Sequence, residues 1–260
     1  MSNARSVIAL VGLSFEARIA AGPGVHVVCR DAGADLAGHL NDAIKRGCRS
    51  IISFGVAGGL APHLRAGDWI VASSIIDSGK RKPTDIAWSQ KLLKAIPGAG
   101  FAVVAGVDAP VSDPALKREW HMKTGAAAVD MESHIVARLA AVHSLAFAAI
   151  RVIVDPAHRT VPAAALAGMR ADGKTDPSAV LRALCAAPSE ALGLMRVAAD
   201  AFFARNALQR GRRLLGPSLG LGEGAHTDPV AVAAATRREP GILSGLGEGI
   251  PHPLAAEKLA

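Results

Sequence analysis

The segment Ala128-Val129-Asp130-Met131-Glu132-Ser133, with Arg151-Val152-Ile153-Val154-Asp155-Pro156 further along, contains the residues that decide how this chain folds. Each segment places an acidic residue at the end of a short apolar run, and such a run is typical of a buried strand. Pro156 stops the second strand, because proline has no N–H for the ladder and restrains the residue before it. We therefore expect Asp155 at the carboxyl end of a strand.

The position of Asp155 suggests acid chemistry. In open α/β sheets, ligands bind outside the carboxyl ends of the strands. Ile153 and Val154 would partly bury a carboxyl group there, and burial raises its pKa because it disfavours the charged form. Such an acid holds a proton near neutral pH and can donate it. The alternative is that Asp155 only caps a loop or a helix start, the ordinary role of an isolated Asp-Pro pair.

Strands and helices alternate along most of the chain, and many of the strands are apolar on both faces. This pattern predicts an α/β fold with three layers, in which helices cover both faces of a central, mostly parallel or mixed sheet. The expected strands are residues 6–13, 25–29, 50–54, 68–76, 101–107, 126–129 and 145–154. The expected helices are residues 35–46, 86–96, 113–123, 132–142, 175–184 and 189–208.

Composition limits the classes of protein. The chain has 260 residues, half of them hydrophobic, so it can bury a sizeable core. Its formal charge of +7 favours anionic ligands or surfaces, but aromatic residues make up 3% and tyrosine is absent. The stacking platforms of a single-strand nucleic-acid binder are therefore scarce, and we predict no nucleic-acid partner.

The cysteines and the hydrophobic segments indicate a cellular location. Cys29, Cys48 and Cys185 are far apart, which argues against a zinc knuckle, a redox dithiol or a disulfide framework and fits a reducing cytoplasm. No segment reaches about twenty uninterrupted apolar residues, the length of a membrane span. We expect a soluble, cytoplasmic protein. Arginines that follow Phe202 and Phe203 leave peripheral contact with an acidic inner-membrane surface as an alternative.

The end of the chain differs from the rest. From Gly216 onward it is rich in Gly, Ala and Pro, and the tetrapeptide at 221–224 recurs at 246–249. Such a segment buries too little apolar surface to offset the entropy lost on ordering. We predict a folded domain over residues 1–215 and a mostly disordered tail over residues 216–260.

A glycine-rich segment, Gly55-Val56-Ala57-Gly58-Gly59, follows the expected strand at 50–54. Glycines there would let a phosphate, sugar or base approach the backbone closely. The spacing matches neither the dinucleotide-binding fingerprint nor the P-loop. A lone glycine cluster is more often a tight turn, but together with the two acidic segments it indicates a binding loop.

In these features the chain resembles the nucleoside phosphorylase and nucleosidase superfamily. The correspondence runs from Gly12 to about Val154, and the later helices continue it more loosely. Four motifs carry it in order: a glycine loop at 51–60, a base-pocket segment at 107–109, a ribose-binding motif at 129–132 and the strand of the catalytic acid at 151–155. The resemblance implies a nucleoside phosphorylase-like catalytic domain.

The resemblance also implies roles for residues in cleavage of a bond between ribose and a purine. The leaving base must be protonated and the sugar must carry oxocarbenium charge. Asp155 would be the proton donor and Glu132 would accept hydrogen bonds from two ribose hydroxyls, with Met131 under the sugar. Glu16 would orient water as in the nucleosidase branch, or it is only a surface residue at a helix start. The implied base and loop contacts are Gly55, Val56, Ala57, Gly58, Asp108 and Val129.

The sequence leaves hydrolysis and phosphorolysis open. Phosphorolytic members carry an arginine and a serine around the glycine loop, where this chain has Ser53 and Val56. A phosphate would need another cation such as Arg18 or Arg65, since a dianion is not held in a low-dielectric site without donors. We expect no cofactor, with inorganic phosphate as a co-substrate in the phosphorolytic case. The histidines lack ligand spacing, so we expect no metal.

A subgroup is indicated by the segments at 12–20 and 155–159, which look most like those of the bacterial hopanoid-associated phosphorylases. That likeness implies a lipid-linked substrate, adenosylhopane, converted to adenine and ribosyl- or phosphoribosylhopane. Pro110 stands where the family often has a phenylalanine against the purine, so Trp88 or Trp120 would have to cover the base. Relatives self-associate, which implies a homo-oligomer.

Two other functions remain as alternatives. A methylthioadenosine or adenosylhomocysteine nucleosidase, acting on a small-molecule adenosyl substrate, would use the same catalytic groups. A non-catalytic nucleoside-binding module on the same fold would not need a proton donor. The presence of Glu16, Glu132 and Asp155 together therefore argues against the module.

Overall fold

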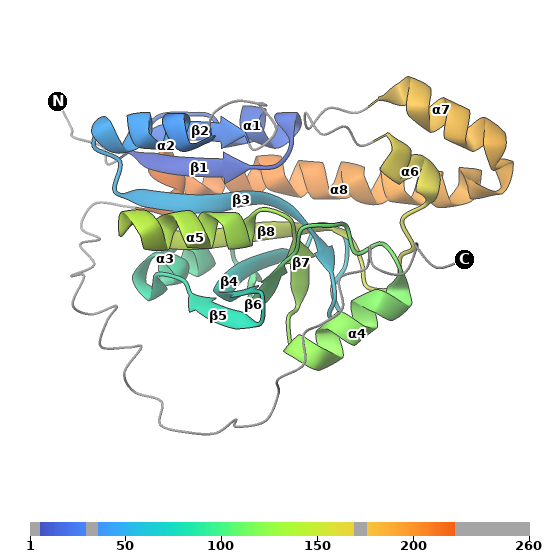
Figure 1. The fold of residues 1–260 in the computed structure, drawn as a ribbon, viewed down its shortest axis with the longest axis horizontal. Coiled ribbons are helices and arrows are strands. Elements are labelled where there is room, and N and C mark those ends of the chain that lie inside the picture. The colour runs from blue at the N-terminus through green and yellow to red at the C-terminus, as the bar shows by residue number, and fades with distance from the viewer. Residues whose placement is uncertain (1–5, 30–35, 169–175, 222–260) are drawn as a thin grey trace, which may run out of the picture. The chain divides into compact units, whose positions relative to one another are not determined.

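The computed structural model describes residues 6–29, 36–168 and 176–221 (Figure 1). Strands and helices alternate over much of the chain as the sequence predicts, although α1, β5 and α6 were not expected. In chain order the elements are β1 (Val7–Val11), α1 (Ser14–Ala20), β2 (Val25–Cys29), α2 (Leu36–Lys45), β3 (Ser50–Gly59), β4 (Trp69–Asp77), β5 (Lys80–Pro83), α3 (Ile86–Ala95), β6 (Gly100–Gly106), α4 (Pro114–Thr124), β7 (Ala128–Asp130), α5 (Ser133–His143), β8 (Ala146–Asp155), α6 (Ala163–Ala167), α7 (Pro177–Ala186), a 3-10 turn (Pro188–Glu190), α8 (Ala191–Leu215) and a second 3-10 turn (Pro217–Gly220).

The strands form one mixed sheet. Its order is β2-β1-β3-β7-β6-β4-β5, and β8 pairs with both β3 and β4. The pairings of β3, β7, β6, β4 and β8 therefore close into a ring. The pairs β3–β7, β4–β5 and β4–β8 are antiparallel, and the others are parallel. The predicted α/β class with a central mixed sheet is confirmed.

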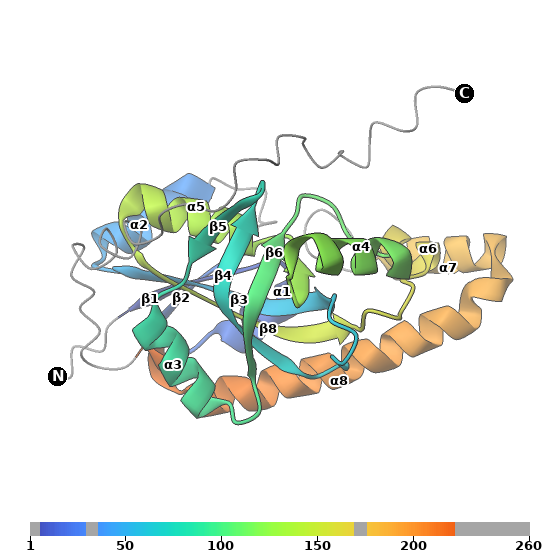
Figure 2. The ribbon, with the colours of Figure 1, turned by 90° about the horizontal axis from the view of Figure 1, so that it is seen from below.

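Helices cover both faces of the sheet, which gives the three expected layers (Figure 1, Figure 2). Successive residues of a strand point to opposite faces, and β1 shows this directly. Ile8 and Leu10 pack in a core with α2 and α5, while Val7, Ala9 and Val11 pack in a second core with α1, α3 and α8. Because both faces are buried, β1 is apolar at every position, as expected for a central strand.

The glycine-rich segment is part of a strand, so our expectation of a loop there was wrong. β3 continues from Ser50 to Gly59 and stays paired with β8, with a register shift between Ala57 and Gly58. The physical reason is the length of β8, which runs to Asp155 and gives β3 a partner from Ser50 to Gly58. The glycines allow side chains to come close to the backbone of β3, and they do not form a turn.

The packed body extends beyond Leu215. Leu219 and Leu221 are buried, and the indole N–H of Trp88 donates to the Leu219 carbonyl at 3.1 Å. Lys91 Nζ donates to the Leu221 carbonyl at 3.0 Å. The first residues of the segment for which we predicted a tail, 216–221, are thus anchored on α3. The rest of that segment, 222–260, lies outside the described residues.

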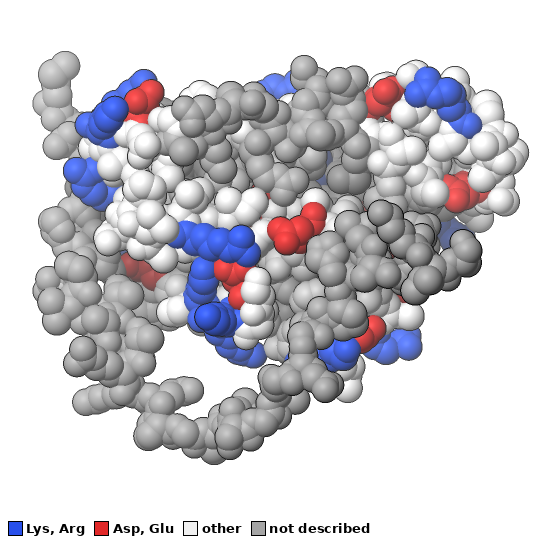
Figure 3. Space-filling model, in the orientation of Figure 1, with Lys and Arg blue, Asp and Glu red and all other residues white. Residues whose placement is uncertain are grey.

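α8 has a buried face and an exposed one. Ala204, Ala207 and Leu208 pack on the sheet, whereas Phe202 and Phe203 are more than half exposed. Among the described helices, none is long and apolar enough to cross a membrane. On the part of the surface visible in Figure 3, basic and acidic side chains are interspersed rather than gathered in one patch of a single sign.

Two truncated chains test where the packed body ends. A chain that ends at Leu221 is expected to match the full-length protein in urea unfolding. A chain that ends at Leu215 loses two buried leucines, each contributing about 1.5–3 kcal/mol, and should be less stable by roughly 3–6 kcal/mol. Equal stability of the two truncated chains would contradict the anchoring of residues 216–221.

Candidate active site

The two acidic segments meet at one end of strands β7, β3 and β8. Gly55 of β3 is in register with Arg151 of β8, and further along Gly58 is in register with Asp155. On the other side of β3, Gly58 is in register with Val129 of β7. Gly58 therefore lies between the strand that carries the ribose-type motif and the strand that ends in the acid.

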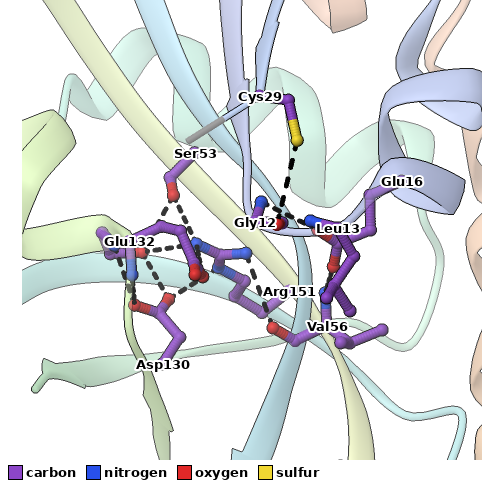
Figure 4. Close-up of polar contacts among 10 residues, drawn as sticks. Gly12, Leu13, Glu16, Cys29, Ser53, Val56, Asp130, Glu132 and Arg151 are labelled. Atoms are coloured by element: carbon purple, nitrogen blue, oxygen red, sulfur yellow. Dashed lines mark hydrogen bonds and ion pairs between the residues drawn. The ribbon is translucent and has the colours of Figure 1, made fainter. Parts of the chain in front are cut away.

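Arg151 is the centre of the site, and its side chain is fully buried. Its Nε lies 2.6 Å from Asp130 Oδ2, and its Nη2 lies 3.5 Å from Glu132 Oε2 (Figure 4). Nη2 also donates to the hydroxyls of Ser53 and Ser133. Burial by itself would lower the pKa of Arg151, but the surrounding carboxylates raise it, so the guanidinium stays charged.

Glu16 lies on the other side of this cluster. Its side chain is buried, so the alternative of a surface glutamate is wrong. Its carboxylate accepts hydrogen bonds from the backbone N–H groups of Gly12 at 3.0 Å, Leu13 at 2.8 Å and Val56 at 2.7 Å. Burial raises the pKa of Glu16, and the charge of Arg151 and these three N–H donors oppose the rise. α1 thus directs its first-turn glutamate inward, onto β3.

The glycines explain how such groups come so close. A Cβ on Gly12 would lie 2.5 Å from Glu132 Oε1, and a Cβ on Gly55 would overlap Glu16 and lie 2.7 Å from Arg151 Nη1. A Cβ on Gly58 would lie 3.3 Å from both carboxyl oxygens of Asp155. At Gly12 and Gly55 a Cβ would force these side chains to shift, whereas at Gly58 the contact would only be tight.

Asp155 is the last residue of β8, as the sequence predicts. Its side chain is 14% exposed, and its Oδ2 lies 2.6 Å from Nζ of Lys117. Burial raises the pKa of Asp155, as expected, and the Lys117 ammonium opposes the rise. Asp155 therefore differs from Glu132: each of the two carboxyl groups has its own cation.

The other predicted contacts lie on β3 and around the ends of β6 and β7. Val129 and Ala57 are buried, while Met131 and Val56 are half-buried. Asp108 is 75% exposed, and its carboxylate is 3.0 Å from Nε2 of the buried His134. The structure thus places Asp108 at the surface, outside the Arg151 cluster.

The two tryptophans that might cover a base lie in different places. Trp88 is fully buried in the core with α3 and α8, so it cannot cover a ligand, and that suggestion was wrong. Its ring lies in the core between the sheet and helices α3 and α8, where α3 packs against the second 3-10 turn. Trp120 of α4 is half-buried and packs near Val129, on the side of the candidate site.

Some functional candidates escaped the sequence analysis. Arg151 interrupts the apolar run of β8, and a lone charge in such a strand is a usable signal of a buried ion pair. Lys117 gave no signal, because α4 is rich in charged residues and looks solvated. Within the described ranges, no group of three or more His, Cys, Asp and Glu side chains could hold a metal ion.

Comparison with known proteins identifies the family and agrees with the fold. The family model of the phosphorylase superfamily matches residues 12–186, and the chain belongs to this superfamily. A comparison with curated protein sequences gave no match.

Three solved structures illustrate the likeness of fold. The 5'-methylthioadenosine/S-adenosylhomocysteine nucleosidase of Helicobacter pylori is 14% identical, with a TM-score of 0.59 over 82% of this chain and 97% of that one. Futalosine hydrolase of the same organism is 14% identical, with a TM-score of 0.55 over 82% and 96%. A putative nucleosidase of the first kind from Francisella philomiragia is 16% identical, with a TM-score of 0.54 over 81% and 96%. At these identities the likeness establishes the fold.

Replacing Arg151 by methionine tests the buried network. Arg151→Met would leave buried carboxylates without their cation and should lower the free energy of unfolding by about 3–5 kcal/mol at neutral pH. The loss should grow as pH rises above 4.5, the ordinary pKa of Glu16. Removing the guanidinium raises the folded-state pKa of Glu16 further, and a raised carboxyl pKa loses stability with rising pH. Urea unfolding at acidic and at neutral pH measures both effects.

Arg138→Met is the matched control, because Arg138 also pairs with an aspartate, Asp77, but its side chain is 49% exposed. Lys82 remains 2.8 Å from Asp77 in this variant. The expected loss is less than about 1 kcal/mol. If Arg151→Met lost no more free energy of unfolding than Arg138→Met, the Arg151 network would contribute no more than a surface ion pair.

Proposed function

We propose that this protein cleaves the N-glycosidic bond of an adenosyl compound and releases adenine. The observation that carries the proposal is the desolvated carboxyl of Asp155, which ends β8 beside Gly58 and Val129, next to the strand that leads into Glu132. Membership of the phosphorylase superfamily and the likeness of fold to nucleosidases support it.

The two carboxyl groups suit different tasks. Asp155, whose pKa is raised by burial, would protonate the leaving base, because a cleaved purine must not depart as an anion. Glu132, 3.5 Å from the Arg151 guanidinium, would accept hydrogen bonds from ribose hydroxyls. Such bonds would fix the sugar while oxocarbenium charge develops. Met131, half-buried beside Glu132, would pack under the sugar ring.

The charges favour hydrolysis over phosphorolysis. Three carboxyl groups, Glu16, Asp130 and Glu132, act on the single guanidinium of Arg151. A phosphate dianion would be repelled there, and Ser53 is already bonded to Arg151. A carboxylate has about four lone-pair sites, and backbone N–H groups fill three on Glu16. The remaining site would hold the attacking water.

The finer proposal concerns the substrate. The motifs at 12–20 and 155–159 resemble those of hopanoid-associated enzymes, so adenosylhopane is our first candidate. Exposed apolar side chains on α8, Leu192, Met195, Phe202 and Phe203, would suit a lipid-linked substrate at a membrane surface. The second candidate is a small thioether nucleoside such as methylthioadenosine, which the likeness of fold to nucleosidases favours.

An adenine-release assay separates these reactions. Adenosylhopane in detergent and methylthioadenosine in buffer are each incubated with the protein, with and without inorganic phosphate. We expect release of adenine from adenosylhopane at a rate that phosphate does not change. A requirement for phosphate would make the protein a phosphorylase. Release from methylthioadenosine alone would contradict the hopanoid assignment, and release from neither would contradict the proposed function.

Asp155→Asn tests the proton donor. The amide keeps the shape of the side chain but cannot supply the proton, so kcat should fall by about 10²–10⁴-fold while binding of the adenosyl substrate is retained. Asp85→Asn is the control, because Asp85 caps α3 by accepting from the N–H of Trp88, and an asparagine oxygen can do the same. Equal kcat values for wild type and Asp155→Asn would rule out Asp155 as the acid.

A further inference from the structure

Lys117 is an unusual residue at this site. Of the residues of α4, all of which are described, Lys117 alone is buried, and its side chain has no exposure at all. Its Nζ lies 2.6 Å from Asp155 Oδ2. A lysine is almost never fully buried unless it is paired, because an ammonium taken out of water loses its hydration. The structure therefore pairs the side chain of Asp155 with a buried ammonium, whose removal from water costs free energy.

The surroundings of Nζ fit the charged form of lysine. Besides Asp155 Oδ2, Nζ donates to the carbonyl oxygens of Arg159 at 2.9 Å and Pro156 at 3.1 Å, with the Asp155 carbonyl at 3.4 Å. Every neighbour is an acceptor, which suits the three N–H donors of an ammonium. A neutral amine would turn its lone pair toward one of these oxygens. The contacts also tie the turn after β8 to α4.

We propose that Lys117 is a positioning residue for the reaction proposed above, holding Asp155 Oδ2 so that Oδ1 carries the proton that is transferred. This inference rests on the proposed function of Asp155. In the step, the Oδ1–H bond breaks and an N–H bond forms on the base. The electron pair of the glycosidic bond moves to the base, and the sugar carbon is left as an oxocarbenium ion that water attacks, with loss of a proton. The negative charge left on Asp155 faces the Lys117 ammonium. Lys117 thus stabilises the carboxylate that the transfer creates.

The charged groups around Asp155 set the expected pH dependence. Burial raises the pKa of Asp155, Lys117 lowers it, and Asp200 of α8 raises it. Arg159, which follows β8, has its Nε 2.6 Å from Asp200 Oδ2 and so offsets that charge. Activity requires protonated Asp155 and falls as pH rises through its pKa. Without the Lys117 ammonium that pKa is higher, so the fall in activity should move to higher pH.

The test compares adenine release as a function of pH in three lysine variants. Lys117→Met should lower kcat by roughly 10-fold to 100-fold with little change in KM, and should shift the basic limb of the kcat/KM profile to higher pH. Lys117→Arg keeps the positive charge, so its basic limb should stay near that of the wild type. Lys123→Met is the matched control on the same helix, because Lys123 pairs with Glu119 at the exposed surface. Its kcat and pH profile should be unchanged.

The outcomes separate this inference from the proposed function. If Asp155→Asn is inactive and Lys117→Met folds with an unshifted basic limb, Lys117 is only structural and the inference fails while the function stands. If Asp155→Asn keeps full activity, Asp155 is not the acid and the inference fails with it. Release of adenine from neither adenosyl compound by the wild type would contradict the proposed function.

A second measurement does not depend on the folding of Lys117→Met. Nitrogen-15 NMR of wild-type protein labelled at lysine Nζ should show one buried ammonium whose chemical shift changes as Asp155 titrates, and this change should be absent in Asp155→Asn. A wild type in which no lysine signal responds in this way would overturn the inference.

Discussion

The buried guanidinium of Arg151 is the constraint on which the rest of the structure depends. Removing such a charge from water costs several kcal/mol, and it is offset only if well-placed carboxylates and hydroxyls surround it. Asp130 comes from the end of β7, Glu132 and Ser133 from the start of α5, and Ser53 from β3. β8 can therefore lie only where those segments converge. This position of β8 sets where one end of the ring of paired strands lies.

Close approach to this charge explains the glycines. A strand normally presents a Cβ at every second position on each face, and at Gly55 that atom would occupy the space of Glu16 and Arg151. At Gly12 it would meet Glu132. The glycine-rich part of β3 therefore stays in the strand, with a register shift between Ala57 and Gly58. The same residues in a loop would leave the guanidinium and the carboxylates without the backbone that orders them.

Glu132 and Asp155 each pair with a different cation, so the two carboxyl groups have different properties. Glu132 has the Arg151 guanidinium, and Asp155 has the Lys117 ammonium of α4. Burial and partners that differ in this way are how a site keeps one carboxyl ionised and another ready to carry a proton. Glu16 is a third case, since backbone N–H groups of β3 and of Gly12 and Leu13, which precede α1, hold its buried carboxylate.

The sequence by itself determined the fold class, the layers and the end of β8, because apolar periodicity and Pro156 act locally. It also indicated Asp155, Glu132 and the glycine segment, whose residue types suit chemistry or close approach. Only the tertiary structure decided that Glu16 is buried and that Lys117 of α4 reaches Asp155. Those contacts join residues far apart in the chain, and a charged residue on a helix looks the same in sequence whether it faces water or a buried carboxylate.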